Sequence, residues 1–207
     1  DPPLADRSDL PNGEPVATLR GELGLSDLPV VLYSGNFEAY QGVETLVDAT
    51  PLLSGAQFLF MGGEPAEIEA LRARARGLSS ESRCVFSGKR PPSELPAFLA
   101  LADLLVSPRS KGENTPFKAF TYLASGKPLV ATRIPSHTQL LSDETAFLVE
   151  PTPAGLAGGI RDALENPEEA RARADRGHAL IEGEYSAARY REKVAQAYAT
   201  VEKLTRA

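Results

Sequence analysis

Cationic side chains cluster around one expected helix start in the second half of the chain. An apolar run ends near Val106, and a polar loop then leads into a helix through Thr115 and Pro116. We expect the Thr115 hydroxyl group to cap this helix and Pro116 to take its first position. The N–H groups and dipole of a helix start attract anions, so the segment predicts either a phosphate site or an ordinary capped loop. The cations are Arg109, Lys111 and Lys118.

Six short apolar runs predict the sheet that positions this loop. Each run is apolar throughout rather than alternating, which is typical of parallel strands covered by helices on both faces. Helical patterns separate the runs, so we expect a doubly wound, Rossmann-like α/β fold with a six-stranded parallel sheet. After Pro151 the pattern is wholly helical and predicts a helical C-terminal tail. The runs are 30–34, 57–61, 83–87, 103–107, 128–132 and 146–150.

The loops after the predicted strands are where a ligand site is expected, because such sheets bind ligands beyond the carboxyl ends of their strands. Helices are expected over 116–125 and 138–141, beside two of these loops. Asn36 in the first loop is either a turn residue or a ligand contact. His137, in the loop after the fifth strand, is expected to be a capping or solvent-exposed residue rather than a functional one.

The composition is that of a globular protein with one well-buried domain or two small ones. The 207 residues are 42% hydrophobic and 24% charged, with a net charge of −6. This acidic balance argues against nucleic acid or anionic lipid as a bulk electrostatic partner. The single cysteine, Cys84, excludes an intrachain disulfide, and with only two histidines a zinc site is not expected.

The start of the chain and its hydropathy bear on its location. No apolar run approaches the roughly 20 residues that span a bilayer, so we expect no transmembrane segment. The sequence opens at Asp1 without an initiator methionine or the apolar core of a signal peptide. We therefore expect a cytoplasmic protein and a chain that begins partway through a longer polypeptide.

Five sequence motifs follow one another along the chain. They are PNG at 11–13, YSGNFEAYQGVETLVDA at 33–49, FLFMGG at 58–63, VFSGKRPPSELPAFLALADLLVSP at 85–108 and GENTPFKAFTYLASGKPLVAT at 112–132. In order and spacing, these motifs resemble the C-terminal half of GT-B-type retaining glycosyltransferases, the glycosyl transferase group 1 family (glycosyltransferase family 4). The resemblance extends from about Leu10 to the end of the chain. Glycine loops are common individually, but five matching pieces in the same order make the resemblance specific.

The resemblance implies a domain that binds a nucleotide-diphosphate sugar, from which the sugar passes with retention to an acceptor hydroxyl in surface-polysaccharide or glycolipid assembly. It implies a linker over 1–28, the donor-binding domain over 29–185, and a helix over 186–207 that packs on an absent N-terminal, acceptor-binding domain. Enzymes of this kind generally need no bound metal for the donor, so no metal or other cofactor is expected. Peripheral membrane contact of the full-length protein and self-association through the last helix are compatible with this organisation.

The resemblance also assigns backbone contacts with the donor to two of the loops. Gly88, Lys89 and Arg90 would line the base, mostly through their backbone groups. Gly35 and Asn36 would lie under the diphosphate, together with the start of the helix expected over 116–125.

Side-chain roles follow from the same resemblance, with two departures from the family pattern. Lys118 and Arg109 would offset the diphosphate charge, and Glu113, the catalytic position, would bind donor-sugar hydroxyls and hold the anomeric carbon in place. The second glutamate of the family's spaced pair, which grips the ribose, falls on Thr121, a shorter side chain and a weaker acceptor. A basic residue expected in the first loop falls on Gln41, so Lys118 would have to stand in for it.

Two alternative functions stay open at this stage. Thr121 and Gln41 motivate a non-catalytic domain that binds nucleotide sugars or serves as a scaffold. A nucleotide-sugar epimerase of the same GT-B architecture would carry its catalytic acids on the absent half. The sequence does not identify the base, the sugar or the acceptor.

Overall fold

The centre of the molecule is one six-stranded parallel sheet with the strand order β3-β2-β1-β4-β5-β6. The computed structural model describes residues 6–186, 189, 191–192, 194–196, 198 and 201, so the helix predicted over 186–207 falls largely outside the described residues. The sheet confirms the predicted doubly wound α/β fold. The strands are β1 (Val30–Ser34), β2 (Gln57–Met61), β3 (Cys84–Gly88), β4 (Leu104–Ser107), β5 (Leu129–Thr132) and β6 (Phe147–Val149).

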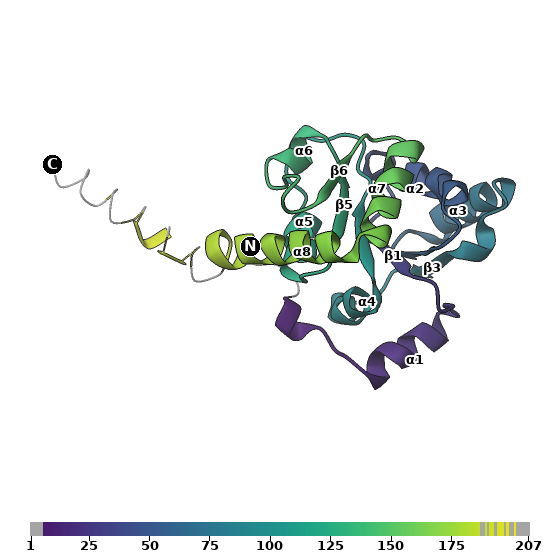
Figure 1. Cartoon of the computed structure of the whole chain (residues 1–207), viewed down its shortest axis with the longest axis horizontal. Helices are drawn as coiled ribbons and strands as arrows, with labels where there is room; N and C mark the ends of the chain where they lie inside the picture. The colour runs from purple at the N-terminus through teal and green to yellow at the C-terminus, as the bar shows by residue number, and fades with distance from the viewer. Residues whose placement is uncertain are drawn as a thin grey trace.

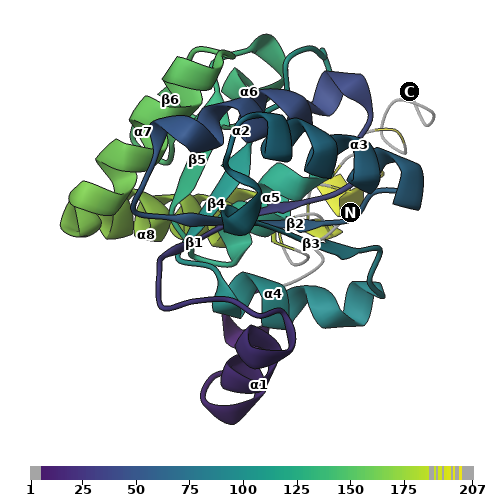
Figure 2. The ribbon, with the colours of Figure 1, turned by 90° about the vertical axis from the view of Figure 1, so that its right-hand side faces the viewer.

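Helices cover both faces of this sheet (Figure 1). Helices α2, α3 and α7 pack on one face and α4 and α5 on the other, with α1 packed against α4; α8 contributes Ala170 to the first cluster and Ile181 to the second. Figure 2 shows α2, α3 and α7 on the side opposite to α4 and α1. The short α6 follows β5. The helices are α1 (Glu14–Glu22), α2 (Val43–Ala49), α3 (Pro65–Gly77), α4 (Leu95–Leu101), α5 (Phe117–Ala124), α6 (Pro135–Thr138), α7 (Pro153–Glu165) and α8 (Pro167–Glu184).

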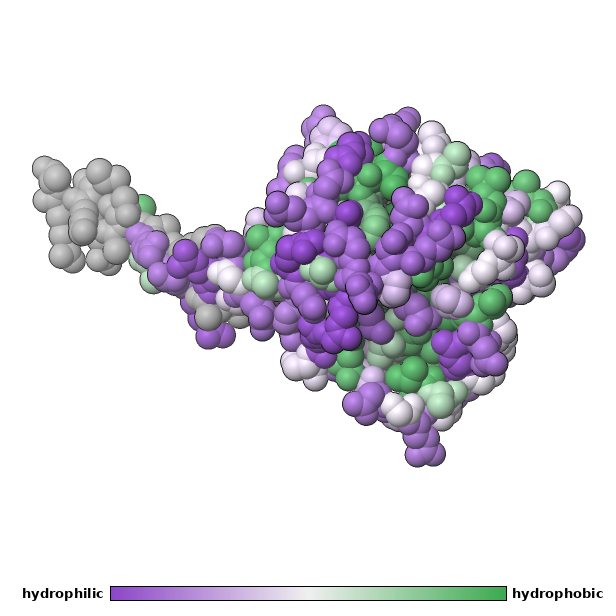
Figure 3. All heavy atoms as spheres, in the orientation of Figure 1, coloured by the Kyte–Doolittle hydropathy of each residue, from purple (hydrophilic) through white to green (hydrophobic). Residues whose placement is uncertain are grey.

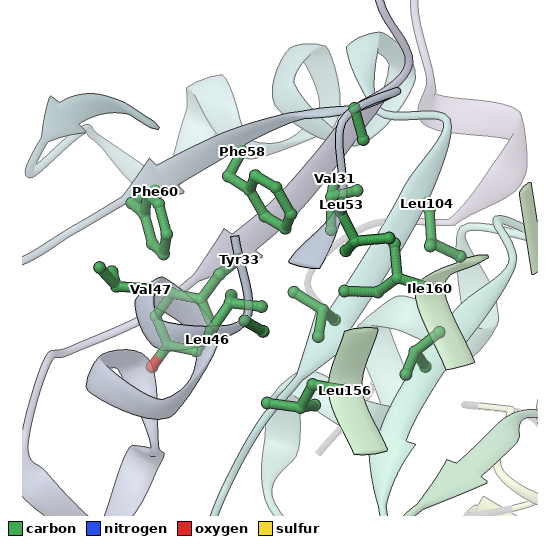
Figure 4. Packing of buried hydrophobic residues seen from close by; sticks show 14 of the residues in the cluster. Val31, Tyr33, Leu46, Val47, Leu53, Phe58, Phe60, Leu104, Leu156 and Ile160 are labelled. Atoms are coloured by element: carbon green, nitrogen blue, oxygen red, sulfur yellow. The ribbon is translucent and has the colours of Figure 1, made fainter. Parts of the chain in front are cut away.

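Alternate residues of each strand build two hydrophobic clusters, one on either face of the sheet. Val31 and Tyr33 of β1 belong to the cluster under α2, α3 and α7, whereas Val30 and Leu32 belong to the other. Figure 4 shows the first cluster, where side chains of β1 and β2 meet those of α2 and α7. Because both faces are covered, the central residues of the strands are apolar on both sides of the sheet, as the sequence predicted.

Two helix boundaries differ from the prediction. Pro116 rather than Thr115 is the N-cap residue of α5, with an extended backbone (φ −72°, ψ 133°) and no side-chain capping hydrogen bond. The prediction that Thr115 caps the helix is therefore wrong, and its hydroxyl group instead donates to Oε1 of Gln139 at 3.0 Å. α6 covers Pro135–Thr138 rather than 138–141, because a proline favours the first turn of a helix.

The chain changes direction across the sheet between β1 and β4. The strands continue from β1 to β2 and β3 on one side, and from β4 to β5 and β6 on the other. The helices that follow β1 and β4, α2 and α5, therefore lie on opposite faces of the sheet, and ligands of this fold bind at the carboxyl edge near this point.

Three further findings concern the helices, the metal-ligating side chains and the surface of the described part of the chain. None of its helices is long and apolar enough to cross a membrane. No group of three or more His, Cys, Asp or Glu side chains in that part could hold a metal ion. Figure 3 shows a largely hydrophilic surface along α8, where this helix crosses the face in view.

Candidate functional site

A cavity of about 390 Å³ lies at the carboxyl ends of β1, β2 and β3. The ends of these three strands and the loops that follow them line it at residues 34–36, 61–63, 89–90 and 92. Helix α5 contributes Lys118, Thr121 and Tyr122, which share one helix face because they are three and four residues apart. The cavity therefore lies at the edge of the sheet where the sequence predicted a ligand site.

Tyr122 fixes the start of the loop after β1. Its hydroxyl oxygen accepts a hydrogen bond from the backbone N–H of Ser34 at 2.8 Å and lies 3.0 Å from the Ser34 hydroxyl oxygen. Burial raises the pKa of Tyr122 to about 12, so the phenol stays protonated at neutral pH. The loop backbone thus leaves the sheet in a conformation set by α5.

Lys118 brings a partly buried amine to the cavity. Its Nζ atom donates to the hydroxyl oxygen of Tyr33 at 3.0 Å and to Oε1 of Gln41 at 3.1 Å, and it lies 4.2 Å from the centroid of the Tyr33 ring. The Tyr33 hydroxyl group donates in turn to the Asn36 carbonyl oxygen at 2.6 Å. Burial, and next the charge of Arg109, lower the pKa of Lys118 to about 7. The two acceptors that hold the amine, the Tyr33 hydroxyl group and the Gln41 side chain, are both neutral.

Gly35 and Gln41, both in the loop after β1, accommodate this amine. A Cβ atom at Gly35 would lie 2.7 Å from Nζ of Lys118, so only glycine lets the lysine reach this position unchanged. Gln41, where the family pattern predicted a basic residue, is buried and accepts from Lys118. The amine of Lys118 in α5 therefore lies beside Gln41, the position at which the family pattern has a basic residue.

The loop after β3 adds two more cations. Lys89 is exposed and forms an ion pair with Glu64 at the N-cap of α3. Arg90 is partly buried, donates to the Ser87 carbonyl oxygen at 3.3 Å and pairs with Glu94 at 3.4 Å. Both cations line the cavity, but each already has an acidic partner.

Arg109 and Glu113 belong to the loop between β4 and α5 and do not line the cavity. The Arg109 guanidinium group donates to the carbonyl oxygens of Lys111 at 2.7 Å and Asn114 at 3.0 Å, and it lies 5.1 Å from the centroid of the Tyr40 ring. Glu113 is exposed, and its carbonyl oxygen accepts from the Gln139 side chain. The charge of Arg109 nevertheless acts on the cavity, because after burial it is the second cause of the lowered pKa of Lys118.

Six of the nine predicted site residues thus surround one cavity and three do not. The six are Gly35, Asn36, Lys89, Arg90, Lys118 and Thr121. The three outside its lining are Gly88, whose carbonyl oxygen accepts from the Gly62 N–H group, with Arg109 and Glu113. Sequence reasoning missed Tyr33 and Tyr122; the spacing of four residues between Lys118 and Tyr122 could have placed the second on the same helix face.

His137 is fully buried, so it is neither the capping nor the solvent-exposed residue that the sequence predicted. Its Nδ1 atom lies 2.8 Å from the Thr132 carbonyl oxygen, which can only accept, so Nδ1 carries the proton. Nε2 then accepts from the Ser107 hydroxyl group at 2.9 Å. Burial lowers the pKa of His137 to about 4, which keeps the ring neutral.

The strand order and the cavity at its switch point define a Rossmann-like, doubly wound α/β domain. Within this class, the chain belongs to the family of glycosyl transferases group 1, whose family model matches residues 28–166. The helix start at the cavity and the glycine loops predicted from the sequence fall inside that match.

Curated relatives are glycosyltransferases. The chain is 30% identical over 191 residues to alpha-D-kanosaminyltransferase of Streptomyces kanamyceticus, a match that covers 88% of this chain and 48% of that protein. It is 30% identical to phosphatidyl-myo-inositol mannosyltransferase of Mycobacterium leprae, over 77% of this chain and 44% of that protein. The chain thus spans about half the length of the curated relatives it matches.

Solved structures share the fold. Anabaena Alr3699/HepE in complex with UDP-glucose superposes with a TM-score of 0.84 at 20% identity, covering 95% of this chain and 56% of that one. The C-terminal domain of a glycosyl transferase group 1 family protein from Francisella tularensis gives a TM-score of 0.71 at 15% identity, covering 88% of this chain and 99% of that domain.

Proposed function

We propose that this chain is the donor-binding domain of a retaining glycosyltransferase, which transfers a sugar from a nucleotide-diphosphate sugar to an acceptor hydroxyl group. The observation that carries the proposal is Lys118, a partly buried amine with neutral partners at the carboxyl edge of the sheet. A diphosphate is the group that such an amine would bind most strongly, because an anion would favour its charged form. The family membership and the relatives support the same reaction class.

The proposed donor would extend across the cavity from the β3 loop to α5. The backbone near Lys89 and Arg90 would contact the base, and Thr121 would contact the ribose. Lys118 would offset the charge of the leaving diphosphate, a role that preorganised cations fill in group transfer. Glu113 would bind the donor sugar from the loop after β4.

The metal requirement and the biological setting are part of the proposal. We propose that donor binding needs no metal, since the cavity supplies its own cations, so a chelator should leave nucleotide affinity unchanged.

A role in polysaccharide or glycolipid assembly is supported by relatives that include the putative colanic acid biosynthesis glycosyl transferase WcaI of Escherichia coli. The cytoplasmic location predicted from the sequence is also kept as a proposal.

Calorimetric titration of this chain with UDP and uridine tests the proposal. UDP is the first nucleotide to use because it is bound in the Anabaena structures, with GDP and ADP as the alternatives. In the Lys118→Met variant we expect UDP to bind about 10- to 150-fold more weakly, since one charge-assisted hydrogen bond contributes about 1.5–3 kcal/mol, while uridine affinity stays the same.

The matched control is Lys111→Met, which removes an exposed lysine of the loop after β4. Equal losses of UDP and uridine affinity in Lys118→Met would contradict the diphosphate role of this lysine. A folded wild-type chain that binds none of the nucleoside diphosphates would favour the non-catalytic scaffold function instead.

A further inference from the structure

The loop between β4 and α5 is held at both ends by side chains from one short segment. This segment consists of α6 and the residue that follows it, Gln139. The loop carries Arg109 and Glu113, two residues with proposed roles in donor binding. The contacts connect parts of the chain that lie between 5 and 30 residues apart.

The start of the loop is fixed through His137. The neutral ring accepts from Ser107 at the end of β4 and donates to the Thr132 carbonyl oxygen at the end of β5. The Thr132 hydroxyl group donates to the Arg109 carbonyl oxygen. Through one buried imidazole, the ends of two neighbouring strands and the first residues of the loop keep a fixed relative position.

The end of the loop is fixed through Gln139. Its Nε2 atom donates to the Glu113 carbonyl oxygen at 2.8 Å, and its Oε1 atom accepts from the Thr115 hydroxyl group at 3.0 Å. Gln139 itself is exposed, so it contributes little to the core. Water could satisfy the same exposed loop groups, so the effect of these two bonds is to select one loop conformation.

We propose that His137 and Gln139 are positioning residues that hold the loop between β4 and α5, and with it the Arg109 guanidinium group, in one conformation. The Arg109 guanidinium group is bonded to the carbonyl oxygens of Lys111 and Asn114, so it moves with the loop. The consequence for catalysis rests on the proposed function, whereas the positioning itself is a property of the free chain.

Hydrogen exchange of the free chain tests the positioning directly. In Gln139→Ala we expect the backbone amides of residues 110–115 to exchange about fivefold faster, as expected for the loss of a hydrogen bond of ordinary strength. Gln139→Glu keeps the size and the acceptor for Thr115 but turns a carboxylate toward the Glu113 carbonyl oxygen, so its effect should be at least as large. The control is Thr138→Ala, an exposed neighbour whose hydroxyl group bonds only within the start of α6.

A second measurement distinguishes positioning from a general loss of stability. The titration of Lys118, followed by NMR of its side chain, should shift to higher pH in Gln139→Ala, because Arg109 moves away from the amine. Unchanged exchange in the loop, or an unchanged Lys118 titration, would overturn the proposal. Failure of the wild-type chain to bind UDP would contradict the proposed function and leave the positioning of the loop standing.

Discussion

At the scale of single residues, Lys118 is the side chain whose charge responds to the contents of the cavity. Its partners Tyr33 and Gln41 are neutral, and burial lowers the pKa of the amine to about 7. A bound diphosphate would favour the ammonium form and raise this pKa. Binding of the proposed donor is therefore coupled to the uptake of a proton.

The first prediction is a pH dependence of nucleotide binding. Below pH 7 the free amine is mostly protonated, so Lys118 should add little to the pH dependence of UDP affinity there. Above pH 7 the amine must first gain a proton, so affinity should fall by up to about tenfold per pH unit until the pKa of the complex is reached. Calorimetry between pH 7 and 9, in buffers of different ionisation enthalpy, measures both the affinity and the proton uptake.

Lys118→Met is the control for this profile, and we expect its UDP affinity to be flat over the same range. A flat profile in the wild-type chain would show that Lys118 does not exchange a proton on binding. The range above pH 7 is chosen because the terminal phosphate of UDP is then mostly ionised, since a phosphate monoester has its second pKa near about 6.

The second prediction concerns Tyr122, whose hydroxyl group accepts from the Ser34 N–H group. Tyr122→Phe leaves that partly buried donor without its partner, so the free energy of unfolding should fall by about 1–3 kcal/mol. Urea denaturation measures the change. Tyr40→Phe, which keeps the aromatic ring beside Arg109, should change stability by much less; equal losses would show that the bond to Ser34 is not important.

At the scale of elements, the strands could be predicted because each is a local apolar run. β1 and β2 have the predicted bounds, since both faces of the sheet are covered and all their residues except Ser34 are buried. The partners of Lys118 could not be predicted, because Tyr33 and Gln41 lie 85 and 77 residues away. The Thr115 hydroxyl group bonds to Gln139 instead of capping α5, and no local pattern in the sequence indicates this partner.

The third prediction concerns the contact between the loops after β1 and β4. Gly42 has φ of 71°, and a Cβ atom there would lie 2.0 Å from the Pro108 carbonyl oxygen. Gly42→Ala should therefore destabilise the chain by at least about 1–3 kcal/mol, because a left-handed backbone and a backbone clash combine. Thermal or urea unfolding checks this value.

The matched control for Gly42→Ala is Gly158→Ala in α7. A Cβ atom at Gly158 would meet nothing within 4 Å, and alanine favours a helix. This variant should stabilise the chain by up to about 1 kcal/mol. A Gly42→Ala variant as stable as the wild type would mean that the two loops separate without cost.

The fourth prediction is a loss of stability in acid through His137, which joins β4, β5 and α6. Its pKa of about 4 in the folded chain is below the ordinary value, so the unfolded chain binds more protons between about pH 6.5 and 4. Stability is therefore fully present above pH 6.5 and falls as the pH approaches 4, by at most about 3 kcal/mol. Urea titrations at several pH values measure the slope.

Replacing each of the two histidines in turn assigns this acid slope. His137→Gln should lower stability at pH 7 and reduce the loss between pH 6.5 and 4. His178→Gln is the comparison, because His178 lies on α8, far along the chain from the β4 and β5 ends. If His137→Gln keeps the full slope, other groups are responsible for it.

At the scale of the whole molecule, the proposed site depends on both layers of the fold. The cavity is lined by loops from three neighbouring strands and by α5, and Tyr33 reaches Lys118 from the opposite hydrophobic cluster. The net charge of −6 would repel a diphosphate at long range, so recognition must come from the local cations. Because the chain spans about half the length of its relatives, we expect it to bind nucleotide without transferring a sugar by itself.

The fifth prediction follows from this dependence on the whole fold. A ligand that binds only the folded state stabilises it by about 2.7 kcal/mol at a concentration of 100 Kd. For a chain of this size, that corresponds to a rise in Tm of about 5–10 °C. A thermal-shift titration with UDP, GDP and ADP should give such a rise for one base, and uridine at the same concentrations should give almost none. Lys118→Met should lose most of the shift, although Met61 and Leu95 still line the cavity of the variant. A shift that survives this substitution would place the nucleotide elsewhere on the molecule.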